Sequence, residues 1–276
     1  MHEFNFDSID IRIPRRSKDS HKGNFGRLLI IGGSKGMGGA AILSSEAALY
    51  TGTGLINLQM HCSNIQASLE RNPEVMASEV DADLSIQNID TLLFGPGLKS
   101  DEWAQGIFKN CLKKNKFKHV VLDAGVLNFF ENFYSNNPDI FENLVLTPHP
   151  GEAGKLLNIS AEEVQNDRIS AVKKISKKYN AYVILKGNNT LIASSNDDDG
   201  IFICSEGGPE LASGGTGDVL AGIVSSLIAQ GMEVLNSCIL AVAVHSRAGK
   251  IFKTNTGEIG LNASSLIPIS RELLNE

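Results

Sequence analysis

Short apolar runs, each ended by glycine or a polar residue, alternate with helical patterns along nearly the whole chain. This order is typical of a mainly parallel β-sheet with helices on both faces and right-handed crossovers. In such sheets ligands bind beyond the carboxyl ends of the strands. Glycine-rich or polar segments follow five of the expected strands, at residues 32–33, 95–97, 123–125, 147–149 and 186–187. The sequence therefore predicts one α/β domain over residues 1–276, with a binding site where these segments meet.

The hydrophobic periodicity also predicts the individual elements. Strands are expected at 27–33, 55–60, 91–97, 119–125, 143–149, 181–187, 190–194 and 201–204. An Asn-Asn turn is expected between the strands at 181–187 and 190–194, and the acidic turn at 197–199 is interpreted as a solvated hairpin turn rather than a calcium loop. Helices are expected at 39–52, at 101–116 with Ser100 as a possible N-cap, at 160–178 behind a Ser160–Glu163 capping box, and at 218–230 and 233–252 to close the chain.

Composition excludes several classes of protein. The net charge is −6 and no long basic run is present, which argues against nucleic acid as a partner. The four cysteines form no CxxC pair, so we expect reduced thiols in the cytoplasm rather than disulfides or a zinc site. No apolar run is long enough to span a bilayer, and the first 20 residues are interpreted as an N-terminal extension without signal or anchor character.

The segment SGGTGD, from Ser213 to Asp218, leads directly into an apolar-periodic helix. Its glycines allow the backbone to approach an anion closely, and the amides and dipole of a helix N-terminus attract negative charge. A carboxylate at this point suits a base that accepts a proton from a hydroxyl group while a phosphoryl group is transferred. The motif therefore indicates kinase-type chemistry with Asp218 as the base; the alternative is that Asp218 only caps the helix.

Three other segments carry candidate site residues. The loop from Gly32 to Ala41 has neither the GxGxxG nor the P-loop spacing, and it predicts either a close backbone approach to a ligand or a plain turn. In TPHPGE, two prolines flank His149, whose imidazole could contact a substrate, and the Glu152 carboxylate could hold a hydrated Mg²⁺ ion. In LKGNNT, Lys186 could neutralise a nucleotide phosphate; the alternative is a hairpin with an exposed lysine.

Five segments in order resemble the ADP- or ATP-dependent NAD(P)H-hydrate dehydratases of the ribokinase-like superfamily: SHKGNFGRLLIIGGSKGMGGAA, LLFGPGL, LDAG, LTPHPGEAGKLL and ASGGTGDVLAGI. TPHPGE and GGTGDVLAG are the specific parts, because related vitamin kinases usually carry Asn-x-x-Glu in place of the segment from His149 to Glu152. The resemblance implies a ribokinase-like three-layer sandwich without the epimerase domain that is fused to some members. It also implies dehydration of the S-epimers of hydrated NADH and NADPH, with a nucleotide phosphorylating the ring hydroxyl before phosphate leaves. The expected nucleotide is ADP, with ATP as the alternative donor. Relatives often form tetramers.

The family's functional residues transfer onto this sequence residue by residue. The resemblance implies that Asp218 is the base and contacts the substrate together with Ala40, Gly97 and His149. It implies an anion hole of amides from Gly215, Thr216 and Gly217, and it places Glu152 at the magnesium-associated position. The nucleotide site implied by the resemblance consists of Lys186, Gly187, Asn188, Asn189, Thr190 and Gly217.

One segment departs from the family's pattern. Relatives usually read Asn-Pro-Gly-Met where this chain has Gly208, Pro209, Glu210 and Leu211. The missing asparagine leaves a contact near the phosphates without its family residue, and we expect Glu210 to be solvated. Two alternative functions remain at this point: a kinase for a small vitamin alcohol with the same fold, and a nucleotide-binding regulatory protein without turnover.

Overall fold

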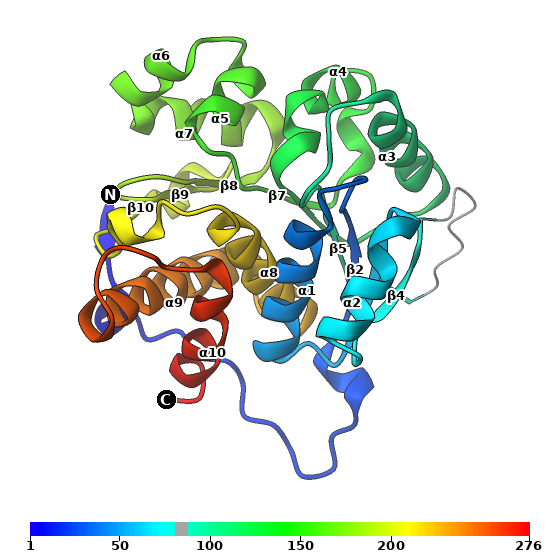
Figure 1. Ribbon diagram of the computed structural model, residues 1–276. Coiled ribbons are helices and arrows are strands. Elements are labelled where there is room, and N and C mark those ends of the chain that lie inside the picture. The colour runs from blue at the N-terminus through cyan, green and yellow to red at the C-terminus, as the bar shows by residue number, and fades with distance from the viewer. Residues whose placement is uncertain (81–87) are drawn as a thin grey trace.

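The computed structural model describes residues 1–80 and 88–276, which form a central sheet covered by helices on both faces (Figure 1). The strands, in their order across the sheet, are β1 (His2–Phe4), β10 (Ile201–Cys204), β9 (Leu191–Ala193), β8 (Tyr182–Leu185), β7 (Asn143–Leu146), β6 (His119–Leu122), β5 (Thr91–Phe94), β2 (Arg27–Ile31), β3 (Leu55–Met60) and β4 (Met76–Glu79). Only β9 pairs antiparallel, with β8 on one side and β10 on the other, among the described strand pairs. The predicted α/β fold with a mainly parallel sheet is confirmed.

The helices divide between the two faces. Helices α3 (Glu102–Lys114), α4 (Phe130–Tyr134), α5 (Pro150–Leu157), α6 (Ala161–Asn166) and α7 (Arg168–Tyr179) lie on the upper side in Figure 1. Helices α1 (Gly38–Tyr50), α2 (Ile65–Arg71), α8 (Thr216–Ala229), α9 (Val234–Asn255) and α10 (Ala263–Leu273) lie below the sheet in that view. The fold is therefore a three-layer sandwich, as expected.

Each central strand contributes to both layers of packing. In β2, Leu28 and Ile30 join the hydrophobic cluster under α1, α8 and α9, whereas Leu29 and Ile31 join the cluster under α3 and α7. This division follows from the period of two along a strand, and it explains why the strand sequences are continuously apolar rather than alternating.

Several expected elements differ from the structure. The helix expected at 160–178 is two helices, because Asp167 adopts a non-helical conformation (φ −145°, ψ 73°) and its side chain accepts a hydrogen bond from the Ser170 amide at the start of α7. Asp101, not Ser100, caps α3: its side chain accepts from the Ala104 amide, whereas the Ser100 hydroxyl donates to the Gly125 carbonyl. The β8–β9 connection covers residues 186–190 rather than an Asn-Asn turn alone.

The sequence reasoning also missed elements near both ends. The N-terminal extension contains β1, which adds a parallel edge strand beside β10, and β4 with α2 lies at the opposite side of the sheet. A further helix, α10, follows the two that were expected to close the chain. No helix within the described residues is both long enough and apolar enough to cross a membrane.

Candidate active site

The five polar segments named from the sequence meet at one edge of the sheet. They follow β2, β5, β6, β7 and β8, which are neighbours in the order β8-β7-β6-β5-β2 and all run parallel. Their carboxyl ends therefore lie side by side, as the position of ligand sites in parallel sheets requires. This edge is where the candidate residues gather.

The N-terminus of α8 has the geometry of an anion site. Gly215 is its N-cap, and its φ of +92° is a conformation that favours glycine. Thr216, Gly217 and Asp218 form the first turn, where helix amides have no intrahelical acceptor. The Thr216 hydroxyl donates to the carbonyls of Leu211 (2.9 Å) and Ser213 (3.0 Å), and the Thr216 amide also donates to the Ser213 carbonyl (3.4 Å). These contacts fix the loop at the start of the helix.

Asp218 is in the first turn of α8 but does not cap it, because Gly215 is the cap and no side chain supplies the cap hydrogen bond. The capping alternative is therefore wrong. Burial, reinforced by the carboxylates of Asp123 and Glu152 against the opposing effect of Lys186, raises the pKa of Asp218 to about 7. A carboxyl group with this pKa exchanges protons near neutral pH, which is the property a general base requires.

Lys186 is enclosed by carboxylates rather than exposed. Its ammonium group donates to Asp123 Oδ1 (2.6 Å) and lies 3.9 Å from Glu152 Oε2, and its side chain is 19% exposed. β8 and β9 do form a hairpin, but the alternative in which its lysine is merely exposed is wrong. A Cβ added at Gly217 would lie 3.3 Å from Lys186 Nζ, so the ammonium group lies next to the amides at the start of α8.

Asp123 is a candidate functional residue that the sequence reasoning did not assign. Its side chain is almost completely buried, and its Oδ1 accepts from Thr147 Oγ1 (2.6 Å) as well as from Lys186. The available signal was its position directly after a buried strand at the same edge of the sheet. The sequence showed the segment but not that its carboxylate turns toward the lysine.

His149 and Glu152 form a reciprocal cap at the start of α5. His149 Nδ1 accepts from the amides of Gly151 (3.0 Å) and Glu152 (3.2 Å), while Glu152 Oε2 accepts from the His149 amide (2.8 Å). This arrangement leaves the His149 side chain 57% exposed, with Nε2 3.4 Å from Glu152 Oε1. Burial raises the pKa of Glu152. His149 thus has a structural role in the helix cap, and much of its side chain remains accessible.

Ala40, in the first turn of α1, and Gly97, after β5, lie side by side. The Gly33 amide donates to the Pro96 carbonyl (2.8 Å) and the Ser34 amide to the Gly97 carbonyl (2.9 Å). A Cβ added at Gly97, where φ is +68°, would lie 2.3 Å from the Met37 carbonyl oxygen and 3.0 Å from Ala40 Cβ. The loop before α1 therefore approaches the segment after β5 closely, and the two proposed substrate contacts adjoin.

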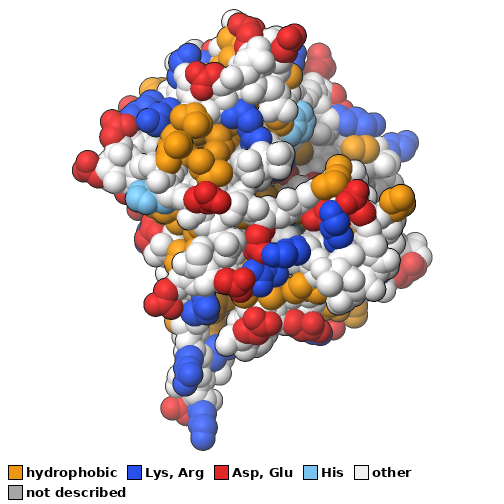
Figure 2. Space-filling model, turned by 90° about the vertical axis from the view of Figure 1, so that its left-hand side faces the viewer, with side chains coloured by type: hydrophobic (Ala, Val, Ile, Leu, Met, Phe, Trp, Pro, Cys, Tyr) orange, Lys and Arg blue, Asp and Glu red, His pale blue; other side chains and the backbone are white. Residues whose placement is uncertain are grey.

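A cavity of about 500 Å³ opens beside α8 on the other side of the site. Of the residues assigned to the nucleotide, Lys186, Gly187, Asn188, Thr190 and Gly217 line it, whereas Asn189 does not. Thr216, expected in the anion hole, also lines the cavity, as do Gly208, Pro209 and Leu211 of the segment that departs from the family's pattern. The rest of the lining was not predicted from the sequence and consists of Glu206, Gly207, Ala212, Leu220, Val242, His245 and Ser246. Figure 2 shows this side of the molecule, where the surface is hollowed.

His245 connects the cavity to the anion loop. It is buried, and its Nε2 lies 2.9 Å from the carbonyl oxygen of Thr216. Burial lowers its pKa to about 4, so the ring is neutral at pH 7 and Nε2–H donates to that carbonyl. This contact holds the first turn of α8 against α9.

Glu210 is buried, which contradicts the expectation that it is solvated. Its side chain is 2% exposed, and Lys253 Nζ lies 3.9 Å from Oε2. A Cβ at Gly208 would lie 2.7 Å from the same oxygen, so the carboxylate occupies the space that a side chain at position 208 would need. Glu210 also does not line the cavity, unlike its neighbours Pro209 and Leu211.

The fold and the site define the class of protein. A crystal structure of a ribokinase-like superfamily protein from Enterococcus faecalis matches with a TM-score of 0.87 and 29% identity, over 99% of this chain and 96% of that one. A second structure, of an ADP/ATP-dependent NAD(P)H-hydrate dehydratase from Bacillus subtilis co-crystallised with ATP and Mg²⁺, matches with a TM-score of 0.85 and 25% identity, over 97% and 99% of the two chains. The protein is a ribokinase-like α/β protein.

Within that class the family is also defined. The family model of NAD(P)H-hydrate dehydratase matches residues 28–272. The chain is 38% identical to an ADP-dependent (S)-NAD(P)H-hydrate dehydratase of Neisseria meningitidis, and the match covers 94% of this chain and 88% of that relative. The chain belongs to the NAD(P)H-hydrate dehydratase family.

Other relatives are longer. The chain is 37% identical to a bifunctional NAD(P)H-hydrate repair enzyme of Coxiella burnetii, over 95% of this chain and 53% of the relative. It thus spans about half the length of the bifunctional relatives that it matches.

Proposed function

We propose that this protein restores NADH and NADPH from their S-hydrates, with conversion of ADP to AMP and phosphate. The observation that supports it most directly is the position of Asp218 in the first turn of α8, directly after Gly217 of the cavity lining, where burial raises its pKa. Membership of the family favours this function over a vitamin kinase of the same fold.

The proposed reaction has two steps that balance. Asp218 accepts the proton of the ring hydroxyl while the hydroxyl oxygen attacks the β-phosphorus of ADP. The bond between this phosphorus and the AMP oxygen breaks at the same time. The ring nitrogen then donates electrons as the C–O bond breaks and phosphate leaves with that bonding pair. The ring then loses a proton to water, which completes the dihydropyridine. Phosphate is a far better leaving group than hydroxide, which is why phosphorylation precedes elimination.

The residues divide this chemistry between them. Amides of Gly215, Thr216 and Gly217 stabilise the charge that moves with the phosphoryl group, because a helix N-terminus attracts anions. Lys186 neutralises a phosphate of the nucleotide, with the loop from Gly187 to Thr190 along the same side of the cavity. His149 contacts the hydrated substrate through the exposed edge of its ring.

The residues around Glu152 could bind Mg²⁺ only as a hydrated ion, through water molecules. Within residues 1–80 and 88–276, no three or more His, Cys, Asp or Glu side chains form a metal-binding group. Mg²⁺ commonly uses one or two carboxylates together with water and substrate phosphates. Glu152 Oε2 already accepts from its own helix cap, so we propose that Glu152 holds the ion through water. The ion would neutralise phosphate charge.

The preferred nucleotide, the cellular location and the assembly are parts of the same proposal. We propose ADP as the phosphoryl donor, because the Neisseria relative is ADP-dependent. ATP is the alternative donor, because the Bacillus protein was co-crystallised with ATP. Three of the four free cysteines are buried, in keeping with a cytoplasmic protein. The resemblance to the family supports a homotetramer, which light scattering would test.

One assay tests the function. The protein is given acid-hydrated NADPH with Mg²⁺ and either ADP or ATP, and recovery of the near-ultraviolet absorbance of the dihydropyridine is followed. We expect recovery with ADP. No recovery with either nucleotide would overturn the proposed reaction, and phosphorylation of a vitamin alcohol in the same conditions would favour the kinase instead.

A further inference from the structure

One wall of the cavity is a connecting segment without strand partners. Residues 206–212 run from the end of β10 toward α8, and Glu206, Gly207 and Leu211 line the cavity. Gly207 has φ of +91°, and Leu211 packs so closely on α9 that a Cβ at Gly249 would lie 2.7 Å from Leu211 Cδ2. Because no sheet pairing fixes this wall, its position depends on side-chain contacts.

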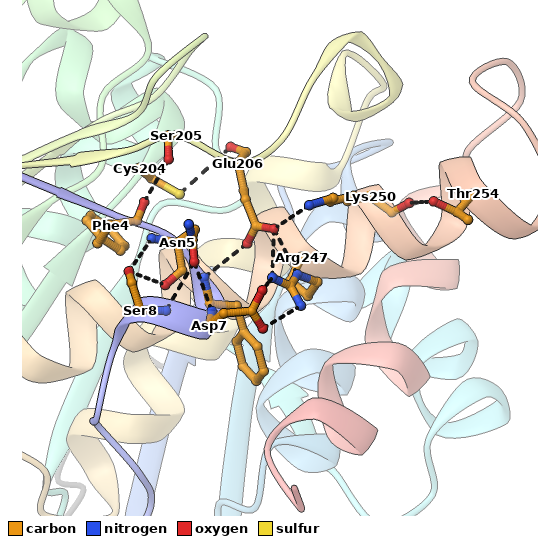
Figure 3. A network of polar contacts seen from close by, with 11 residues as sticks. Phe4, Asn5, Asp7, Ser8, Cys204, Ser205, Glu206, Arg247, Lys250 and Thr254 are labelled. Atoms are coloured by element: carbon orange, nitrogen blue, oxygen red, sulfur yellow. Dashed lines mark hydrogen bonds and ion pairs between the residues drawn. The ribbon is translucent and has the colours of Figure 1, made fainter.

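Glu206 supplies most of those contacts. Its Oε1 accepts from Arg247 Nε (2.9 Å) and Lys250 Nζ (3.0 Å), both on α9, and its Oε2 accepts from the Phe6 amide (3.0 Å) (Figure 3). The Glu206 side chain is 7% exposed. A buried carboxylate with three donors is held firmly, since each charged hydrogen bond is stronger than a neutral one.

The N-terminal segment completes this arrangement from the far end of the sequence. Asp7 accepts from Arg247 through both oxygens, at 3.0 Å and 2.6 Å, and hydrogen bonding to Arg247 lowers the pKa of Asp7. The Arg247 guanidinium also lies 5.2 Å from the centre of the Phe6 ring. The Ser205 amide donates to the Phe4 carbonyl (3.0 Å), directly before the wall begins.

We propose that Asp7 and Arg247 are positioning residues for the nucleotide cavity, which hold its wall at residues 206–212 in the conformation that binds ADP. This inference rests on the proposed nucleotide role of the cavity. Asp7 lies in residues 1–27, outside the match to the family model, whereas Arg247 lies within it.

The structure offers a matched pair of variants. Asp7→Lys places a positive charge beside Arg247 and Lys250. Asp197→Lys is the control, because it places a positive charge beside Lys177. Asp7 and Asp197 side chains are 75% and 80% exposed, and each forms its ion pair at 2.6 Å. Asp197 lies in the turn between β9 and β10 and does not line the cavity. Each variant adds the same positive charge, and this charge by itself would strengthen the binding of an anionic nucleotide.

The test measures ADP binding by calorimetry with Mg²⁺ present and amide hydrogen exchange without nucleotide. We expect Asp7→Lys to weaken ADP binding by about five- to tenfold and to speed exchange at residues 206–212, with the KM for the hydrate unchanged. Asp197→Lys should change neither readout. Binding unchanged in Asp7→Lys, equal losses in both variants, or exchange unaltered at 206–212 would each overturn the proposal.

The readouts separate this inference from the proposed function. Hydrogen exchange and ADP binding are both measured without the hydrate, so failure of turnover in the wild-type protein would overturn the reaction alone. Absence of ADP binding in the wild-type protein would overturn both. Asp7→Asn, which removes the ion pair without adding charge, keeps the test valid if Asp7→Lys does not fold.

Discussion

Two influences on the charge of Asp218 oppose each other. The N-terminus of α8 favours a negative charge, whereas burial and the carboxylates of Asp123 and Glu152 disfavour it, and the pKa of Asp218 settles at about 7. Lys186 moderates this by lying between the carboxylates. Neighbouring charge thus adjusts the proton affinity of the candidate base to neutral pH, where a general base is most effective.

The first prediction concerns the pH dependence of turnover. If Asp218 is the base, kcat/KM should fall as the pH drops below about 7, because protonation removes the base. Asp123→Asn removes a charge that raises the pKa of Asp218, so it should move this acid limb to lower pH. Rates measured across the acid and neutral range with saturating ADP would check both. A rate independent of pH down to about 5 would mean that another group accepts the proton.

The second prediction separates stability from catalysis at the same residue. A carboxyl group whose pKa is raised on folding costs stability once the pH exceeds its unfolded pKa. At pH 8 Asp218 is ionised in both states, so Asp218→Asn should raise the melting temperature, by about 2–4 °C for a chain of this size. Turnover should fall by about 10²-fold or more while ADP binding persists. Calorimetry and the hydrate assay measure the two effects, and a variant that melts lower would show that the carboxylate stabilises the fold.

At the scale of elements, the contact between α1 and α8 places the anion loop. Gly222 lies where the two helices meet, and a Cβ there would be 2.3 Å from the Ser44 carbonyl oxygen. The Ser44 hydroxyl also donates to the Asp218 carbonyl (2.8 Å). The close approach therefore couples the packing of the two helices to the position of Asp218.

The third prediction tests this contact with a pair of glycine variants. Gly222→Ala should destabilise the protein by about 1–3 kcal/mol, because the helices must separate to admit a methyl group. Gly106, within α3, has nothing within 4 Å of an added Cβ. Gly106→Ala should therefore stabilise by about 0.5–1 kcal/mol through helix propensity. Chemical denaturation measures both, and a neutral Gly222→Ala would mean that the helices have room to adjust.

Sequence reasoning located the elements whose signal is local and strong. The buried strands β2, β3 and β5 to β8 and the glycine-rich start of α8 were found, because periodicity and turn chemistry encode them directly. The break at Asp167 was missed because neither glycine nor proline marks it, although an aspartate three residues before Ser170 is a cap signal. β1 has three residues and no pattern of its own, and its pairing with β10 depends on contacts distant in sequence.

The site shows the same division. Sequence reasoning named Asp218, Lys186 and the segments after the strands, because loops at a strand's carboxyl end are easily recognised. It did not find the partner of Lys186, the buried His245 or the wall at Glu206, since these become neighbours only when the sheet and α9 are assembled. Glu210 was expected in solvent because charged residues are rarely buried, and the space at Gly208 that admits it is a property of the folded loop.

At the scale of the whole molecule, one sheet serves two hydrophobic cores. Successive residues of β2 and of β6 enter opposite clusters: Val121 belongs to the core beneath α8, and Val120 and Leu122 belong to the core beneath α3. The edge at β1 is joined to α9 through Asp7 and Arg247. If one layer of helices detached, it would expose one apolar face of strands whose other face packs against the opposite layer.

The last prediction follows from this shared sheet. We expect residues 1–276 to unfold as a single cooperative domain, with the calorimetric enthalpy close to the van't Hoff enthalpy. Scans at two protein concentrations would separate unfolding from dissociation of an oligomer, since only the latter depends on concentration. As a control, Asp7→Asn should leave a single transition, because the β1 edge strand adds to the same sheet rather than forming a separate unit. Two transitions that persist at both concentrations would show that the layers unfold independently.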